Sequence, residues 1–571
     1  MAFVRTVKVK SPTGKIQEYV RIVEAYWENK KPKQRVIANL GNIVSLKKDI
    51  RKIINGLLKV SGEDKIFFAD EGKLKTVKEY GVKYVTEKIW EELGIGEEIK
   101  KNLQKTKGTL DYENWILMMV VNKLSDPCSK LGIFRWLKGV WWPNHNFDER
   151  VCSEELELGK YIKLCKKEVM KFYRAMDYLI KMKKKLENHL YNKLSDLFSL
   201  NMDLVFYDVT SSYFEGGEAD GFKMFGYSRD KKPGKLQIVI GLIMCNGLPI
   251  GHEVFEGNRL DKKTVKEVIK KLKEEFKINR CIFVGDRGLI TDENIEDIEK
   301  NGFDSILALR RRRAKEAKKI LIGDGEKIFC RESEELEWRG VNLPDGTRYI
   351  VCRNPKIAEE TRKDREENLK KLEVELNELT NKVNSQKKPK IKTIVKEVEN
   401  ILKSKHGSRY FNYKIDEKER KLKFYRKEEA IKLEEALDGV YILRTKEKKI
   451  EAVKIIEAYK ELTDIERSFR MMKSVLDIRP YFHRLEDRIR AHTFICYLAY
   501  LIFRYIERKM KADGFNMSGE RAFETLKHLS IGVLEIGDEQ KAYVCEPSVW
   551  QQRIFKSLGL KPPPRIMTEK N

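Results

Sequence analysis

Two aspartates interrupt apolar, strand-like stretches of this chain. Asp208 lies inside DLVFYDVTSSYFEG, and Asp286 ends RCIFVGD. An ionised carboxylate in a buried strand is costly unless a partner offsets the lost hydration. If the two strands are neighbours, the carboxylates repel each other, and one becomes neutral unless a cation lies between them. We therefore expect a shared cation site, and the oxygen ligands favour Mg²⁺ or Mn²⁺. Two such ions would support displacement at a phosphodiester.

A third ligand is expected on the helix predicted for EAYKELTDIERSFRMMKSVL. Tyr459, Glu466 and Lys473 are seven residues apart, and Arg470 follows Glu466 by four. Helical spacing places these four side chains on one face. A glutamate beside two cations and a tyrosine suits a metal ligand next to bound phosphates. The alternative is a stripe of surface ion pairs, which is common and contributes little.

The charge balance indicates a polyanionic partner. Lys and Arg number 116 against 89 Asp and Glu, which gives a net charge of +27. Such an excess favours nucleic acid, although a generally lysine-rich composition would also produce it. The loop SRDKKPGK supplies Arg229, Lys231 and Lys232, and the run RRRR supplies Arg310 and Arg311. We expect these side chains to contact DNA phosphates, with solvent-exposed loops as the alternative.

Strand-like and helical patterns divide the chain. Three strand-like runs, then helix, strand, helix and strand, predict a mixed α/β core without a regular βαβ repeat. In the segment between 310 and 440, LKKLEVELNELTNKV suggests a short coiled coil. Asp261, before a predicted helix, is explained by an N-cap. We expect six parts: an N-terminal β-hairpin region (1–45), a helical region that could bind DNA ends (46–200), the first part of the core (201–309), an insertion with a charged helix (310–440), the second part of the core (441–510) and a C-terminal region (511–571).

Composition also bears on the compartment. The nine cysteines are dispersed without a C-x-x-C pair, which argues against a zinc knuckle and fits a reducing cytosol. The beginning, MAFVRTVKVKSPTGK, lacks the apolar segment of a signal peptide. The most apolar run, FICYLAYLIF, is too short to span a bilayer and predicts a core helix. We expect a cytoplasmic protein with no membrane contact.

Taken together, FYDVTSSYFEG, VGDRGL and YKELTDIERSFRMMK resemble the three acidic motifs of DDE transposases from bacterial insertion sequences. The resemblance is to the cut-and-paste branch and extends over nearly the whole chain from about residue 18 to 510. That branch has a helix signature, Tyr-x2-Arg-x3-Glu-x6-Lys. Tyr459, Glu466 and Lys473 match it, whereas Leu462 stands at the arginine position. Lys460 or Arg467 could substitute for that arginine.

This resemblance implies a ribonuclease-H-like core, interrupted by a β-rich and helical insertion and preceded by a mainly helical region. Asp208, Asp286 and Glu466 would then hold two Mg²⁺ or Mn²⁺ ions. Cleavage at the element ends would release a 3′-OH that attacks target DNA, and a homodimer would pair two ends of double-stranded DNA. Trp338 could stack on a flipped base, or simply pack on a strand face. Two alternatives are another metal-dependent nuclease on the same core and a non-catalytic DNA-binding descendant.

Overall fold

A large mixed sheet organises the middle of the chain in the computed structural model, which describes residues 2–12, 14–62, 72–103, 111–143, 147–152, 157–198, 204–279, 281–285, 291–309, 320–321, 328–386, 390–416, 421–536 and 539–567. Its strands are rich in β-branched and aromatic residues, which favour a pleated, buried surface. Across the nine strands, the order is β10 (Cys330–Ser333), β11 (Leu336–Asn342), β12 (Arg348–Arg353), β15 (Val440–Thr445), β9 (Asp304–Ala308), β8 (Ile282–Gly285), β5 (Leu204–Tyr213), β6 (Gln237–Cys245) and β7 (Leu248–Glu256).

β5 is the strand about which the sheet changes direction. It pairs antiparallel with β6 and parallel with β8, and β8 pairs parallel with β9. In this register Asp208 is opposite Leu242, and the preceding residue, Tyr207, is opposite Gly285. The strands that we expected to neighbour each other are therefore adjacent.

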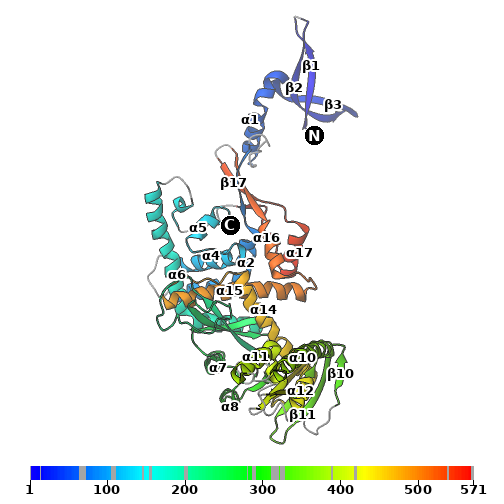
Figure 1. Ribbon diagram of the computed structural model, residues 1–571. Coiled ribbons are helices and arrows are strands. Elements are labelled where there is room, and N and C mark those ends of the chain that lie inside the picture. Colours follow the sequence, from blue (N-terminus) through cyan, green and yellow to red (C-terminus); the bar gives the residue numbers. More distant parts are fainter. Residues whose placement is uncertain are drawn as a thin grey trace. The chain divides into compact units, whose positions relative to one another are not determined.

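Helices that are distant in sequence cover this sheet. α6 (Leu158–Phe198) and α15 (Glu486–Ala512) pack on β7 and on each other, and α4 (Tyr112–Ser125) packs on both (Figure 1). All of FICYLAYLIF lies inside α15 and is buried, so the prediction of a core helix is confirmed. The other helices of this part are α2 (Gly81–Glu92), α3 (Ile95–Leu103), α5 (Gly132–Leu137), α7 (Asp261–Lys270) with a π-helical turn (Lys271–Glu275), α8 (Asp292–Lys300), α16 (Gly519–Lys527) and α17 (Val549–Leu558). Among the described residues, no helix combines the length and the apolar content needed to cross a membrane.

The segment expected as an insertion has two structural roles. Its strands β10, β11 and β12 continue the core sheet through β15. A second hydrophobic core lies beyond them, where α10 (Pro355–Asn384) buries Leu369, Leu372 and Leu376. It is completed by α11 (Ile391–Lys403), a 3-10 turn (Ser404–Arg409), β13 (Phe411–Asp416), β14 (Lys421–Arg426) and α12 (Glu428–Ala436). The predicted coiled-coil stripe is therefore buried inside the segment.

The chain forms two compact units. The larger comprises Lys78–Ser530 and Glu546–Pro563, and the smaller comprises Met1–Val77, Ile531–Cys545 and Pro564–Asn571. In the smaller unit β1 (Ala2–Lys10), β2 (Ile16–Glu28) and β3 (Lys31–Asn42) form an antiparallel sheet, followed by α1 (Ile43–Ser61). A four-stranded sheet has the order β18 (Ile566–Met567), β17 (Glu539–Val544), β16 (Ser530–Ile536) and β4 (Gly72–Glu79). The six-part division of the chain stays a prediction.

Candidate active site

Asp208 and Glu466 line one cavity of about 450 Å³ in the larger unit. Asp208 comes from β5, and Glu466 comes from α14 (Leu462–Ser474), which packs on β5. The residues that line the cavity are Asp208, Val209, Thr210, Arg229, Asp261, Glu466, Phe469, Arg470, Lys473, Ser474 and Arg479. The fold thus brings together two of the three carboxylates that the sequence pattern selected, with four cationic side chains around them.

The alternation of β5 explains how a carboxylate occurs in a core strand. Tyr207 and Val209 are buried at 0% and 3% exposure, whereas Asp208 is half-buried and borders the cavity. Successive side chains of a strand point to opposite faces, so Thr210 shares the face of Asp208. The Asp208 Oδ1 atom accepts a hydrogen bond of 2.7 Å from the backbone N–H of Val209. Asp208 is therefore solvated by the cavity and not placed in the apolar core.

α14 supplies the opposite wall because its apolar side chains pack inward. Ile465 and Met472 are buried, while Glu466 and Arg470 are exposed. Within the part of the chain that the structure describes, the carboxylate of Glu466 has no ion-pair or hydrogen-bond partner. A free carboxylate in a cavity with so many cations is available to a bound cation.

Lys473, the last cation of α14, is held by polar groups. Its Nζ donates to Thr210 Oγ1 at 2.7 Å and to Asp230 Oδ1 at 2.8 Å. Burial lowers the pKa of Lys473 below its ordinary value, Asp230 opposes that effect, and Arg479 and Arg229 add to the lowering. The predicted DNA contact is therefore already engaged with a carboxylate in this structure.

The basic loop SRDKKPGK divides into a part at the cavity and a part outside it. Arg229 lines the cavity, donates its backbone N–H to Ser211 Oγ at 2.9 Å and forms an ion pair with Asp261. Lys231 and Lys232 are exposed and do not line the cavity. Asp261 is the first residue of α7, and its N-cap is Leu260, so the N-cap prediction for Asp261 was wrong.

Tyr459 does not share a helix with Glu466 and Lys473. It belongs to α13 (Ala452–Lys460), which ends before Glu461, and its ring stacks on Tyr441 with 5.9 Å between centroids. The expectation of one continuous helix over 457–476 was wrong, and Tyr459 is outside the cavity lining. The break lacks a proline or glycine, so no strong breaker signalled it.

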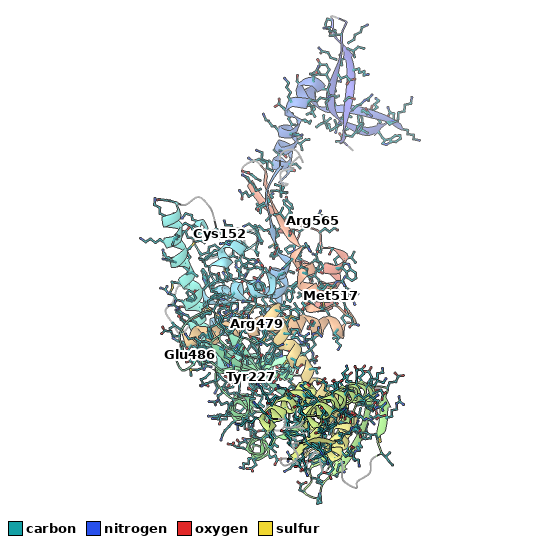
Figure 2. All side chains as sticks on the ribbon, in the orientation of Figure 1. Cys152, Tyr227, Arg479, Glu486, Met517 and Arg565 are labelled. Carbon is teal, nitrogen blue, oxygen red and sulfur yellow. The ribbon has the colours of Figure 1, made fainter. Side chains whose placement is uncertain are left out.

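The two proposed substitutes for the signature arginine also lie outside this cavity. Leu462, at the arginine position, is buried. Lys460 ends α13, and Arg467 lines a different cavity of about 910 Å³. Arg479, between α14 and α15, lines the candidate site instead and is labelled in Figure 2.

The other predicted residues are placed as follows. Trp338 lies in β11, half-buried, opposite Cys352 of β12, with its Nε1 buried and without a hydrogen-bond partner. Asp286, Arg310 and Arg311 lie outside the described residues. Within those residues no group of three or more His, Cys, Asp or Glu side chains is arranged to hold a metal ion.

Sequence reasoning missed three side chains of this region, Thr210, Asp230 and Arg479, and it assigned Asp261 only an N-cap role. Thr210 follows Asp208 by two residues, so strand alternation could have indicated it. Asp230 was hidden within a basic run. Arg479 became relevant only through the path of the chain after α14.

Comparison with known proteins identifies the family. A family model described as transposase DDE domain matches residues 200–502, more than half of the chain. The chain belongs to the DDE transposase family. A second model, IS1634 family transposase, N-terminal domain, matches residues 4–71. The protein is thus a DNA transposase of the bacterial insertion-sequence type, from a family that generally uses divalent metals.

Two further comparisons add less to this assignment. No curated protein matches the transposase. A cryo-EM structure of the piggyBac transposase synaptic complex with hairpin DNA is similar over 78% of each chain, with 11% identity and a TM-score of 0.36. That score is too low to support any argument about the site.

Proposed function

We propose that the transposase cleaves DNA at the ends of its element and joins the freed 3′ ends to target DNA, with Asp208, Asp286 and Glu466 as the catalytic carboxylates. The observation that carries this proposal is the meeting of Asp208 and Glu466 in one cation-rimmed cavity. Asp286 is included because Gly285, the residue before it, is the register partner of Tyr207, the residue before Asp208.

The donor set fits divalent metal ions. Within the described residues, the carboxylate of Glu466 has no partner. The half-buried carboxylate of Asp208 borders the same cavity and supplies further oxygen donors. Hard carboxylate oxygens suit Mg²⁺ or Mn²⁺, and we propose two ions held by Asp208, Asp286 and Glu466. The chemistry that such ions supply when bound is activation of the attacking oxygen and stabilisation of the leaving oxygen.

The protein's own cations would bind and orient the DNA. Arg229, Arg470, Lys473 and Arg479 border the cavity and would hold phosphate oxygens by charge-assisted hydrogen bonds. Fixing the scissile phosphate against the carboxylates supplies the orientation that an in-line displacement requires. Neither step requires a covalent protein intermediate, since water and then a 3′-OH act as nucleophiles.

We also propose a ribonuclease-H-like arrangement for the core. Support comes from three antiparallel strands, β7, β6 and β5, followed across the sheet by the parallel strands β8 and β9. In chain order, β5 to β7 form a meander, while α7 precedes β8 and α8 precedes β9. β10 to β12 would then be an extension of this core.

The proposed partners are the double-stranded DNA of the element ends and of the target, bound by a homodimer. The charged helical segment 356–405 is one candidate for the dimer interface. Its apolar stripe, including Leu369, Leu372 and Leu376, packs against α11 and β14 within the chain, so this stripe is not free for a second copy. The dimer contact would have to use another surface.

The decisive experiment uses a duplex that carries the inverted repeats flanking the gene. Asp208→Ala should abolish Mg²⁺-dependent cleavage while leaving duplex binding in a gel-shift assay largely intact. Asp220→Asn is the matched control, because Asp220 lies in the connection that follows β5 and pairs with Lys223 away from the cavity lining. Unchanged cleavage by Asp208→Ala would overturn the proposal, and binding without cleavage by the unaltered protein would favour a non-catalytic descendant.

A further inference from the structure

Asp230 is the one acidic residue of the basic loop SRDKKPGK, and it is nearly buried. Its side chain is 4% exposed, yet it has cations on two sides. Lys473 Nζ lies 2.8 Å from its Oδ1 atom, and Arg479 forms an ion pair with the same oxygen. Figure 2 labels Arg479 on the segment between α14 and α15. Three separate segments of the chain thus converge on one carboxylate oxygen.

The geometry of this group differs from that of an ion pair arranged only for stability. An arginine and a carboxylate pair most strongly when both oxygens accept in parallel. Here both cations use Oδ1, and within the described part of the chain the buried Oδ2 atom has no hydrogen-bond partner. A buried acceptor without a donor is unfavourable for folding, so its presence calls for an explanation.

The explanation lies in where the two cations are held. Lys473 and Arg479 both line the cavity that contains Asp208 and Glu466. Lys473 is kept there by Asp230 on one side and Thr210 Oγ1, at 2.7 Å, on the other. Both contacts keep the ammonium group at the wall of the cavity, although a lysine side chain is otherwise free to move.

We propose that Asp230 is a positioning residue: it holds Lys473 and Arg479 at the wall of the cavity so that both cations meet a phosphate group of the bound DNA. This inference rests on the proposed function and extends it to a residue that itself contacts neither DNA nor metal. Asp230 acts through Lys473 and Arg479, and its loss misplaces two phosphate ligands together.

Removing the Asp230 charge also changes the protonation of Lys473. Asp230 raises the pKa of Lys473, while burial and the neighbouring Arg229 and Arg479 lower it. Asp230→Asn therefore lowers the pKa of Lys473 further, and the ammonium form is lost at a lower pH. Among the described residues, the charged and polar groups around Lys473 are Asp208 and Thr210 of β5, Arg229 and Asp230 of the loop, Asp261 of α7, Glu466, Arg470 and Ser474 of α14, and Arg479.

The test measures cleavage of the flanking-repeat duplex by the full chain across pH. Asp230→Asn should lower kcat/KM by about 100-fold, the scale of a misplaced reacting group. The alkaline limb of its plot of kcat/KM against pH should move to lower pH, whereas Asp230→Glu should keep the alkaline limb of the wild type. In a protein that already carries Lys473→Met, Asp230→Asn should lower kcat/KM by a smaller factor, because only the position of Arg479 is then still affected. Effects of residues that act through each other are not additive. Asp220→Asn, with its carboxylate elsewhere in the same connection, should match the wild type.

Equal losses from Asp230→Asn with and without Lys473, together with an unmoved pH limb, would overturn the inference and indicate a structural role. If Asp230→Asn does not fold, Asp230→Ser replaces it. Failure of both neutral variants to fold, with Asp230→Glu fully active at every pH, would also overturn it. Asp208→Ala distinguishes failure of the proposed function from failure of this inference. If Asp208→Ala cleaves normally, the proposed function fails. If Asp208→Ala is inactive but Asp230→Asn cleaves normally, the proposed function stands and this inference fails.

Discussion

The sheet carries two clusters of opposite charges, and they differ in how completely their charges are paired. The cavity cluster consists of Asp208, Glu466 and their surrounding cations. The β7 cluster consists of Glu187 and Lys183 of α6, Lys271 of the π-helical turn, and His252 and Glu253 of β7. Glu187 and His252 are fully buried, and Lys271 is 4% exposed.

Every charge of the β7 cluster is matched. Lys271 Nζ lies 2.6 Å from Glu187 Oε2 and 2.5 Å from Glu253 Oε1, and Lys183 contacts both acids at 3.1 and 3.0 Å. Burial raises the pKa of Glu187, but the ammonium groups of Lys183 and Lys271 outweigh it and hold that pKa well below its ordinary value. Nothing in this cluster is available to a ligand.

The difference shows which property marks a functional cluster. Both clusters contain perturbed groups and acids beside lysines, so pKa shifts alone do not separate them. What separates them is an open cavity and, as far as the described residues go, a carboxylate without a partner, at Glu466. The β7 cluster serves the fold, whereas the cavity cluster is the one that we propose binds a phosphate and a metal ion.

Neutralising Glu466 gives the largest expected effect and tests the cavity side of this comparison. Glu466→Gln should lower Mg²⁺-dependent cleavage by at least about 100-fold, the scale of losing one preorganised electrostatic group. DNA binding should persist, because an acid is removed from a basic cavity. The control is Asp464→Asn, two residues earlier on α14, where Asp464 lines the second cavity. Equal losses in both variants would remove the distinction between the cavities.

Breaking the β7 cluster should affect stability and not chemistry. Glu187→Ala leaves the buried Lys271 and the half-buried Lys183 with one acid, and loss of one partner in a buried network costs about 3–5 kcal/mol. Thermal unfolding followed by circular dichroism should show a clear drop in melting temperature. The exposed pair of Glu296 and Lys300 on α8 provides the control, since Glu296→Ala should cost less than about 1 kcal/mol. A folded Glu187→Ala protein with normal melting but no cleavage would reverse the assignment of the two clusters.

Local sequence patterns were sufficient for the strands of the core and for the choice of Asp208 and Glu466. A run of β-branched and aromatic residues predicts β5. The carboxylate within that run is unusual because a buried charge is unfavourable unless it is paired. The spacing of Glu466 and Lys473 also survives in α14. These patterns could be read from the sequence because each depends on residues close together in the chain, while the catalytic role of Asp208 and Glu466 stays a prediction.

What the sequence could not provide depends on pairing between distant segments. Asp230 looks like one charge in a basic loop until Lys473 and Arg479, more than two hundred residues later, arrive beside it. The continuation of the core sheet by β10 to β12 is a choice of strand neighbour, which strand patterns leave open. Tyr459 matched a family signature, yet its helix ends at Lys460, one residue after Tyr459, and the Tyr459 ring packs on Tyr441.

The β7 cluster also predicts a pH dependence of stability. Burial lowers the pKa of His252 to about 4, below its ordinary 6.5, so the folded state keeps the ring neutral. The unfolded chain takes up a proton below about pH 6.5 that the folded chain refuses until about pH 4. The part of the free energy of unfolding that depends on a neutral His252 is therefore complete above pH 6.5. It is lost as the pH falls toward 4, by about 2 kcal/mol at pH 5.

The measurement is the melting temperature between pH 7 and pH 5. His252→Phe keeps an aromatic ring beside Tyr497, where the native ring centroids are 4.7 Å apart, but cannot titrate. Its melting temperature should fall less over this range than that of the wild type. The half-buried His483 and the buried His492, whose pKa values burial also lowers, should leave part of the decline in place. Identical slopes would show that His252 does not contribute.

The smallest expected effect concerns Lys231 and Lys232, which lie outside the cavity on the same loop as Arg229. As exposed phosphate contacts, each should lower the slope of log affinity against log salt by about 1 when changed to alanine. Cleavage at saturating DNA should be unchanged, because neither side chain borders Asp208 or Glu466. Fluorescence anisotropy across a salt series measures the slope, with Lys300→Ala on α8 as the control. If cleavage is lost while the salt slope is unchanged, these lysines act with the cavity cluster. The distinction between that cluster and exposed lysines outside the cavity would then be wrong.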